Sequence, residues 1–254
     1  MSIPERLAVV LPAYNEEGVI RPTVEDVLAK LPKLATDHVV VVVDDGSRDA
    51  TGEILDQLAR QDPEHVRVVH QQVNTGYGGA LRAGFEAALE ASAELVFFMD
   101  SDGQFDISDL GSLLPRLAGS DAVVGYRNNR NDPPLRRLNA AGWGWLMGVL
   151  FGVHVRDVNC AFKVFRADFV RAARLRSRGA MISTELLAQA RRAGLKVAQV
   201  PVRHRPRTTG EATGARPAVI AKAFHEAFRL RLALAREAAP VVERLPVRAR
   251  ASRR

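Results

Sequence analysis

The chain has 254 residues with a net charge of +7, and 47% of its residues are hydrophobic. This length and composition are typical of one globular α/β domain with a proper core. No stretch reaches the roughly 18 to 20 consecutive apolar residues that span a bilayer. The single cysteine, Cys160, cannot form an internal disulfide and is expected to be a packed thiol. Because no charged-then-apolar leader is seen at the N-terminus, a cytoplasmic location is predicted.

Short apolar runs alternate with amphipathic segments along the chain. Strands are predicted near residues 7–11, 39–43, 66–70, 95–99, 122–125 and 197–202. Helices are predicted near residues 16–31, 49–61, 78–91, 106–118, 135–151, 183–193 and 217–238. This alternation indicates a mostly parallel central sheet that helices cover on both faces.

Three of the predicted strands end in polar groups. The runs 95–99, 39–43 and 7–11 lead into Asp100-Ser101-Asp102-Gly103-Gln104, Asp44-Asp45-Gly46-Ser47 and Pro12-Ala13-Tyr14-Asn15-Glu16, respectively. In open α/β sheets ligands bind outside the carboxyl ends of the strands, so the three ends can share one crevice. Asp100 and Asp102 stand two residues apart in an extended segment and can converge on one Mg²⁺ or Mn²⁺ ion, which prefers oxygen ligands.

In order and spacing, these motifs resemble those of the family 2 glycosyltransferases, and most closely the dolichol-phosphate (polyprenyl-phosphate) mannosyl- and glucosyltransferases. The likeness spans about residues 7 to 216 and is also carried by Asn74-Thr75-Gly76, Gly125-Tyr126-Arg127, Asp157-Val158-Asn159-Cys160-Ala161-Phe162-Lys163 and Val200-Pro201-Val202-Arg203-His204-Arg205. The resemblance implies a single catalytic domain of the glycosyltransferase A-type, Rossmann-like fold.

The resemblance also implies a metal-assisted nucleotide-sugar site. Asp100, Asp102 and Gln104 match the family's metal stretch, where the cation acts as a Lewis acid on the departing diphosphate. Nucleotide-sugar contacts are implied for Pro12, Tyr14, Glu16, Asp44, Gly76, Asp100, Ser101, Asp102 and Gln104. Simple loop packing stays open for Tyr14, as does a bracing role for Asp45. The chain departs from the pattern at Tyr77, where relatives often place Lys or Arg.

The acceptor site is expected to be basic. A lipid phosphate is an anion at neutral pH and attacks without a dedicated general base, and arginines bind phosphate bidentately while staying charged. The resemblance places Arg127, Arg136 or Arg137, and Arg205 at the lipid phosphate, and the choice between Arg136 and Arg137 is open. The predicted catalytic residues are Asp100, Asp102, Arg127 and Arg205. For Lys163 two alternatives stay open, a surface charge or a position beside the acceptor site. No general-base role is predicted for Glu185.

The predicted reaction is inverting transfer of a hexose from a nucleotide diphosphate sugar to polyprenyl or dolichyl phosphate, with GDP-mannose favoured as donor. UDP-glucose as donor and a hydroxyl acceptor are the alternatives within enzymes. A non-catalytic protein that binds a membrane surface or nucleic acid is the alternative outside them. Nucleic acid is disfavoured as a partner because the basic segment has only two aromatic residues and no recognition module.

The C-terminal part carries the excess positive charge. Residues 201–254 hold 13 Lys or Arg and 4 Asp or Glu, which gives +9. The predicted division is a catalytic domain over 1–216, an amphipathic helix over 217–239 and a basic, disordered tail over 240–254. The stripe of Ile220, Phe224 and Phe228 docks either on the domain or on a membrane, and the same choice holds for the apolar helix 143–151. A peripheral position on the inner face of the cytoplasmic membrane is predicted, with a separate membrane-anchoring subunit left open.

Overall fold

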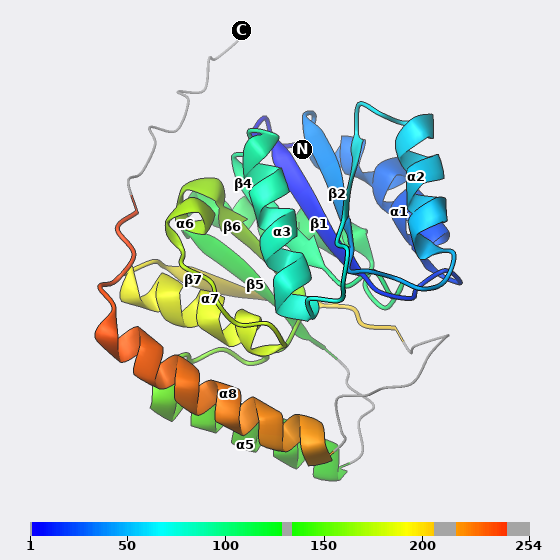
Figure 1. The fold of residues 1–254 in the computed structure, drawn as a ribbon. Coiled ribbons are helices and arrows are strands. Elements are labelled where there is room, and N and C mark those ends of the chain that lie inside the picture. The colour runs from blue at the N-terminus through cyan, green and yellow to red at the C-terminus, as the bar shows by residue number, and fades with distance from the viewer. Residues whose placement is uncertain (1, 129–133, 206–216, 243–254) are drawn as a thin grey trace, which may run out of the picture.

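The computed structural model describes residues 2–128, 134–205 and 217–242, with side chains from residue 141 and from residue 223 in the last two segments. Its described strands form one sheet in the order β3-β2-β1-β4-β6-β5-β7 (Figure 1). The strands are β1 (Leu7–Ala13), β2 (His38–Asp44), β3 (Val66–His70), β4 (Leu95–Met99), β5 (Ala122–Arg127), β6 (Phe162–Arg166) and β7 (Val197–Val202).

Helices connect and flank these strands. They are α1 (Ile20–Lys30), α2 (Thr51–Gln61), α3 (Tyr77–Glu90), α4 (Leu110–Leu113), α5 (Pro134–Phe151), α6 (Ala167–Ala172), α7 (Met181–Arg192) and α8 (Pro217–Arg236). The single helix expected over 106–118 is instead a 3₁₀ turn, the short α4 and a second 3₁₀ turn over Leu114–Ala118. Pro115 explains the break, because proline cannot donate to the α-helical hydrogen-bond ladder.

The sheet is mostly parallel, as the sequence predicts. β1 pairs in parallel with β2 and β4, and β2 pairs in parallel with β3. Every residue of β1 and β2 is buried, which explains their nearly unbroken apolar runs. The connections through α1 and α2 move outward along the sheet, whereas α3 returns across β2 and β1 (Figure 1). Right-handed crossovers therefore place α3 on the face opposite α1 and α2.

Neither β6 nor α6 was expected from the sequence. β6 lies between β4 and β5 and runs antiparallel to both. Its sequence, Phe-Lys-Val-Phe-Arg, includes a lysine that is typical of a solvent-facing position, yet Lys163 is fully buried. A strand of five residues with a buried charge gives no clear periodic signal, so pairing with two distant strands defines it.

α8 packs on the domain mainly through residues outside the predicted stripe, so of the two alternatives the described part of the stripe does not dock on the domain core. Among its residues from 223 onward, Ala227, Leu230 and Leu234 are buried, whereas Phe224 and Phe228 are exposed. The side chain of Ile220 lies outside the described set. α8 lies beside α5, where the rings of Trp143 and Phe224 meet edge to face with centroids 5.5 Å apart (Figure 1). Within the described part of the chain, no helix has the length and apolar character needed to cross a membrane.

Candidate active site

The carboxyl ends of β1, β2 and β4 meet at one edge of the sheet, as the strand order requires. The buried Ser101 hydroxyl donates to the carbonyl oxygen of Pro12 at 2.7 Å and joins the loop after β4 to the end of β1. The loop after β1 is joined in turn to the loop after β2, since Asn15 N–H donates to Ser47 Oγ at 3.0 Å and Arg48 N–H donates to Asn15 Oδ1 at 2.8 Å. These bonds join three separate segments of the chain at the carboxyl edge of the sheet.

Asp100 and Asp102 follow β4 and influence each other electrostatically. Burial and then the charge of Asp102 raise the pKa of Asp100 to about 7. Gly103, with φ of +74°, turns the chain after them, and Gln104 N–H donates to Asp102 Oδ1 at 3.1 Å. A buried carboxyl group whose ionisation is opposed by a neighbouring carboxylate is a suitable environment for a cation.

Gln104 is oriented by the segment after β7. Its side-chain Nε2 donates to the carbonyl oxygen of Arg205 at 3.0 Å, and Arg205 N–H donates to the Gln104 carbonyl at 2.8 Å. An isolated bridge between Phe105 and His204 extends the pairing. Because the amide nitrogen is engaged, the Oε1 atom of Gln104 is the end that can ligate a metal.

The donor set fits Mg²⁺ or Mn²⁺. Among the described residues no group of three or more His, Cys, Asp or Glu side chains is arranged to hold a metal ion. Asp100, Asp102 and Gln104 nevertheless supply oxygen atoms only, and Mg²⁺ commonly takes one or two protein carboxylates and completes its shell with water and substrate phosphate. Burial and the neighbouring charge of Asp102 raise the pKa of Asp100, and a bound cation would offset both effects.

The two acidic residues after β2 have different environments. Asp45 accepts from Thr75 N–H, Thr75 Oγ1 and Gly76 N–H at 2.7 to 2.9 Å, so it braces the loop before α3. The amide of Gly76 is therefore engaged, and a nucleotide contact by Gly76 stays a prediction. Asp44 is 7% exposed and accepts from Ser47 N–H at 2.9 Å and pairs with His70 at 3.1 Å. Its position at the carboxyl end of β2 is compatible with the predicted nucleotide contact.

The first loop presents the remaining donor residues. Tyr14 is 40% exposed, so its ring is available for stacking, while Pro12 is buried within β1. Glu16 is partly buried and its backbone N–H donates to Thr51 Oγ1 at 2.9 Å. Tyr77, which departs from the family pattern, has a pKa raised well above its usual value by burial and then by the charge of Asp100. Its ring therefore lies near the predicted metal ligands.

Arg127 enters the site from the end of β5 and is held by Asp157. Its Nε and Nη2 atoms donate to the two carboxylate oxygens of Asp157 at 2.7 and 3.0 Å. Although burial opposes the charge, this bidentate pair raises the pKa of Arg127. The charge of Arg127 partly offsets the rise in the pKa of Asp100, so the two residues influence each other electrostatically. Asp157 belongs to the family-like motif over residues 157–163, and the motif alone does not predict its pairing with Arg127.

Lys163 is not a surface charge. Its Nζ donates to the carbonyl oxygens of Val158 and Cys160 and to Ser183 Oγ, the first at 3.2 Å and the last at 3.3 Å. Burial lowers the pKa of Lys163 to about 8. The lysine thus holds the loop that carries Asp157. Cys160 is a buried thiol, as predicted, and burial raises its pKa to about 12.

Of the other arginines predicted at the lipid phosphate, only Arg205 has a described side chain. Arg205 is exposed and donates to Asp106 Oδ2 at 2.7 Å, beside the metal stretch. The side chains of Arg136 and Arg137 lie outside the described residues, so the choice between them stays open.

Glu185 is buried and accepts from the backbone N–H groups of Arg176 and Ser177 at 2.8 to 3.0 Å. It supports a loop, which agrees with the prediction that it is not a base.

A mostly parallel sheet with an Asp-x-Asp loop at its carboxyl edge is typical of glycosyltransferases of the A-type fold, and the comparisons support this class. The family described as "Glycosyl transferase family 2" matches residues 8–172. An undecaprenyl-phosphate mannosyltransferase from Micrococcus luteus is 30% identical over 214 residues, covering 81% of this chain and 86% of the relative. A polyprenol monophosphomannose synthase from Mycolicibacterium smegmatis is 31% identical over 215 residues, covering 81% and 80%.

A solved structure gives the fold independently. Glucosyl-3-phosphoglycerate synthase from Mycobacterium tuberculosis, in complex with Mn²⁺, UDP-glucose and phosphoglyceric acid, superposes with a TM-score of 0.68 at 20% identity. The match covers 89% of this chain and 80% of that one. The chain belongs to glycosyltransferase family 2, and both the predicted family and the predicted fold are confirmed.

Proposed function

We propose that this protein transfers a hexose with inversion from a nucleotide diphosphate sugar to a polyprenyl phosphate, with GDP-mannose as the first-choice donor. The observation that carries the proposal is the pair of hydrogen bonds between Gln104 and Arg205, which joins the predicted metal stretch to the predicted phosphate-binding segment. The names of the Micrococcus and Mycolicibacterium relatives supply the polyprenyl and mannosyl classes.

Each part of the proposed reaction is assigned to described residues. A phosphate oxygen of the acceptor attacks the anomeric carbon while the bond to the nucleoside diphosphate breaks. Arg127, held in a fixed orientation by Asp157, and Arg205 bind the acceptor anion and offset its repulsion from the diphosphate. When bound by Asp100, Asp102 and Gln104, a divalent cation supplies Lewis-acid stabilisation of the leaving group. The acceptor phosphate is already ionised, so the residues need not remove a proton.

A donor and acceptor screen tests this proposal. Purified protein is incubated with Mn²⁺, polyprenyl phosphate and either GDP-mannose or UDP-glucose, and lipid-linked sugar is separated from free sugar. Transfer from GDP-mannose is expected, with loss of the product in the Asp102→Asn variant. Transfer only from UDP-glucose would replace the favoured donor. Product formation on a glycan hydroxyl, but not on polyprenyl phosphate, would contradict the proposed acceptor.

We also propose that the enzyme works at the inner face of the cytoplasmic membrane. The acceptor's prenyl chain remains in the bilayer, so the catalytic site must approach the interface. On the neighbouring helices α5 and α8, large apolar side chains face solvent, including Trp145 at 70% and Phe228 at 62% exposure. Leu232 and Phe224 add to the exposed apolar surface of α8. Aromatic and aliphatic side chains of this kind support interfacial binding.

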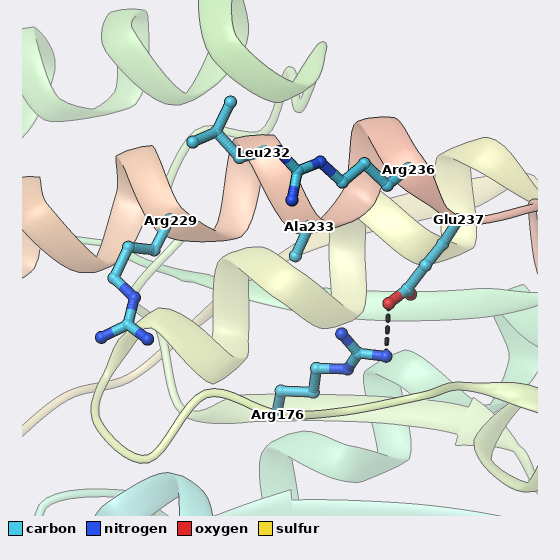
Figure 2. A pocket seen from close by; sticks show the side chains of 6 residues that line it. All are labelled: Arg176, Arg229, Leu232, Ala233, Arg236 and Glu237. Carbon is cyan, nitrogen blue, oxygen red and sulfur yellow. Dashed lines mark ion pairs between the residues drawn. The ribbon is translucent and has the colours of Figure 1, made fainter.

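Positive charge accompanies this apolar surface. A shallow hollow of about 310 Å³ on α8 is lined by Arg176, Arg229, Leu232, Ala233, Arg236 and Glu237 (Figure 2). Arg176 is paired with Glu237, while Arg229 and Arg236 extend from the helix around the hollow (Figure 2). None of these residues belongs to the candidate donor or acceptor site. The charges of Arg229 and Arg236 support attraction to anionic lipid, worth on the order of 1 kcal/mol per basic residue near the surface.

A further inference from the structure

His70 lies against Asp44 because of the sheet register. Asp44 and His70 are paired residues at the carboxyl ends of β2 and β3, and Gln71 N–H donates to the Asp44 carbonyl at 2.8 Å. The His70 Nδ1 atom is 3.1 Å from Asp44 Oδ2, and its Nε2 atom is 3.0 Å from Asp56 Oδ1 on α2. A neutral imidazole has one N–H, so both contacts are hydrogen bonds only when the ring is the imidazolium ion.

Hydrogen bonds to both oxygen atoms fix the orientation of the Asp44 carboxylate. Ser47 N–H engages Oδ1 at 2.9 Å, while His70 engages Oδ2. Gly52, in the first turn of α2, provides the necessary space, since a Cβ atom there would lie 2.9 Å from Asp44 Oδ2. The side chain of His70 is 45% exposed and that of Asp44 is 9% exposed, so the ring forms the outer edge of this pair.

The charges around His70 favour its protonated form. Burial of the ring opposes protonation, but the hydrogen bonds and charges of Asp56 and Asp44 outweigh it and raise the pKa of His70 above 6.5. Asp44 faces the ring from β2 and Asp56 faces it from α2. Because the pKa is raised, the imidazolium is fully present at acidic pH and is lost as the pH rises through that value.

We propose that His70 is a positioning residue for the donor nucleotide: its imidazolium holds the Asp44 carboxylate at the nucleotide end of the crevice, and donor affinity follows the protonation of this histidine. The inference rests on the proposed function, in which Asp44 contacts the nucleotide. Loss of the positive charge releases Asp44 Oδ2, so the carboxylate is no longer held in the orientation that contacts the nucleotide. This weakens donor binding without involving the acceptor.

The test is equilibrium binding of GDP and of UDP, each with Mg²⁺, by calorimetry between pH 6.0 and 8.5. One variant is His70→Gln, which removes the titratable charge. The other is Asp56→Asn, which removes the carboxylate that faces His70 Nε2 and leaves Asp44 unchanged. His65→Gln is the matched control, because His65 pairs with Asp62 at 2.9 Å in a similarly exposed His–Asp contact outside the candidate site. NMR titration of the His70 ring gives its pKa in the wild type and in Asp56→Asn.

The expected result is a pH-dependent ratio of affinities. The wild type should bind the preferred nucleotide about tenfold more tightly than His70→Gln at pH 6.0, the loss typical of a hydrogen bond to a charged group. The two should converge at pH 8.5. The titration of Asp100 affects both proteins equally, so it cancels in the ratio of wild-type affinity to His70→Gln affinity. In Asp56→Asn, the pH at which nucleotide affinity falls should be lower than in the wild type, by as much as the pKa of His70 measured by NMR is lower. His65→Gln should show the same pH dependence as the wild type.

A ratio within about twofold at every pH, or a large ratio that does not change with pH, would overturn the role of His70. The Asp44→Ala variant separates this failure from that of the proposed function. If Asp44→Ala binds nucleotide weakly while His70→Gln binds normally, only the inference about His70 fails. If Asp44→Ala also binds normally, the proposed nucleotide contact itself is wrong.

Discussion

Replacing Arg127 should destabilise the protein and also weaken acceptor binding, and a second substitution can separate the two effects. The pair with Asp157 has two hydrogen bonds, and its side chains are 16% and 8% exposed. Removing one partner of a buried ion pair costs about 3–5 kcal/mol because the other charge loses its compensation. We expect the lower value, about 3 kcal/mol, for Arg127→Ala because some solvent reaches the pair. For a chain of this size that corresponds to a decrease in Tm of about 6–12 °C.

The double variant Arg127→Ala/Asp157→Ala should recover much of this stability, since neither buried charge remains. Its KM for polyprenyl phosphate should stay raised by roughly 10- to 100-fold, because charge-assisted hydrogen bonds to the acceptor phosphate are absent. The KM for the nucleotide sugar should change little. Stability and acceptor affinity therefore respond differently to the second substitution.

Thermal unfolding and steady-state kinetics with each substrate varied in turn measure these effects. Arg166→Ala is the matched control, because Arg166 is also partly buried and donates to the Leu117 carbonyl at 3.1 Å, outside the candidate site. If the double variant regains wild-type KM for polyprenyl phosphate together with its stability, Arg127 is structural only. Equal increases in both KM values would also refute an acceptor-specific role.

Three further outcomes are expected. Asp102→Asn should lose most turnover at nearly unchanged Tm, because a residue after a strand end contributes little to the core; near-normal wild-type activity in EDTA would contradict the metal role. Since the pKa of Asp100 is raised to about 7, protons should compete with Mn²⁺ below that pH, and the metal affinity measured by electron paramagnetic resonance should rise as the pH increases through about 7; a flat profile would exclude this coupling. Phe228→Glu should reduce sedimentation with anionic liposomes and Val73→Glu, at another exposed apolar position, should not; equal binding by both variants, or indifference to lipid charge, would place docking elsewhere.

The acidic edge of the sheet could be predicted from the sequence because its signal is local. A parallel strand covered on both faces must be apolar at nearly every position, which makes runs such as 39–43 and 95–99 recognisable. Polar residues directly after such runs must lie at the strand ends, so the approach of Asp44, Asp100 and Asp102 to a common edge follows from chain direction alone. The predicted family and fold depended on this regularity.

Which face of a helix is buried depended on the packing of distant elements. The sequence of α8 has several apolar residues on more than one side, and the regular spacing of Phe224 and Phe228 left open whether this stripe contacts the domain or a membrane. In the structure Ala227, Leu230 and Leu234 are buried instead, and Phe224 meets Trp143 of α5. Periodicity shows that a helix is amphipathic, but neighbouring surfaces decide which stripe they cover.

The sequence by itself determined the positions of the main strands and the kinds of side chain that follow them. The tertiary structure decided which charges are buried and what compensates them. Lys163 belongs in the interior only because Val158, Cys160 and Ser183 supply acceptors for its Nζ atom. The same holds for the pair of Arg127 with Asp157, 30 residues away. Local periodicity records burial of apolar residues, whereas a buried charge is stable only with partners that the complete fold brings to it.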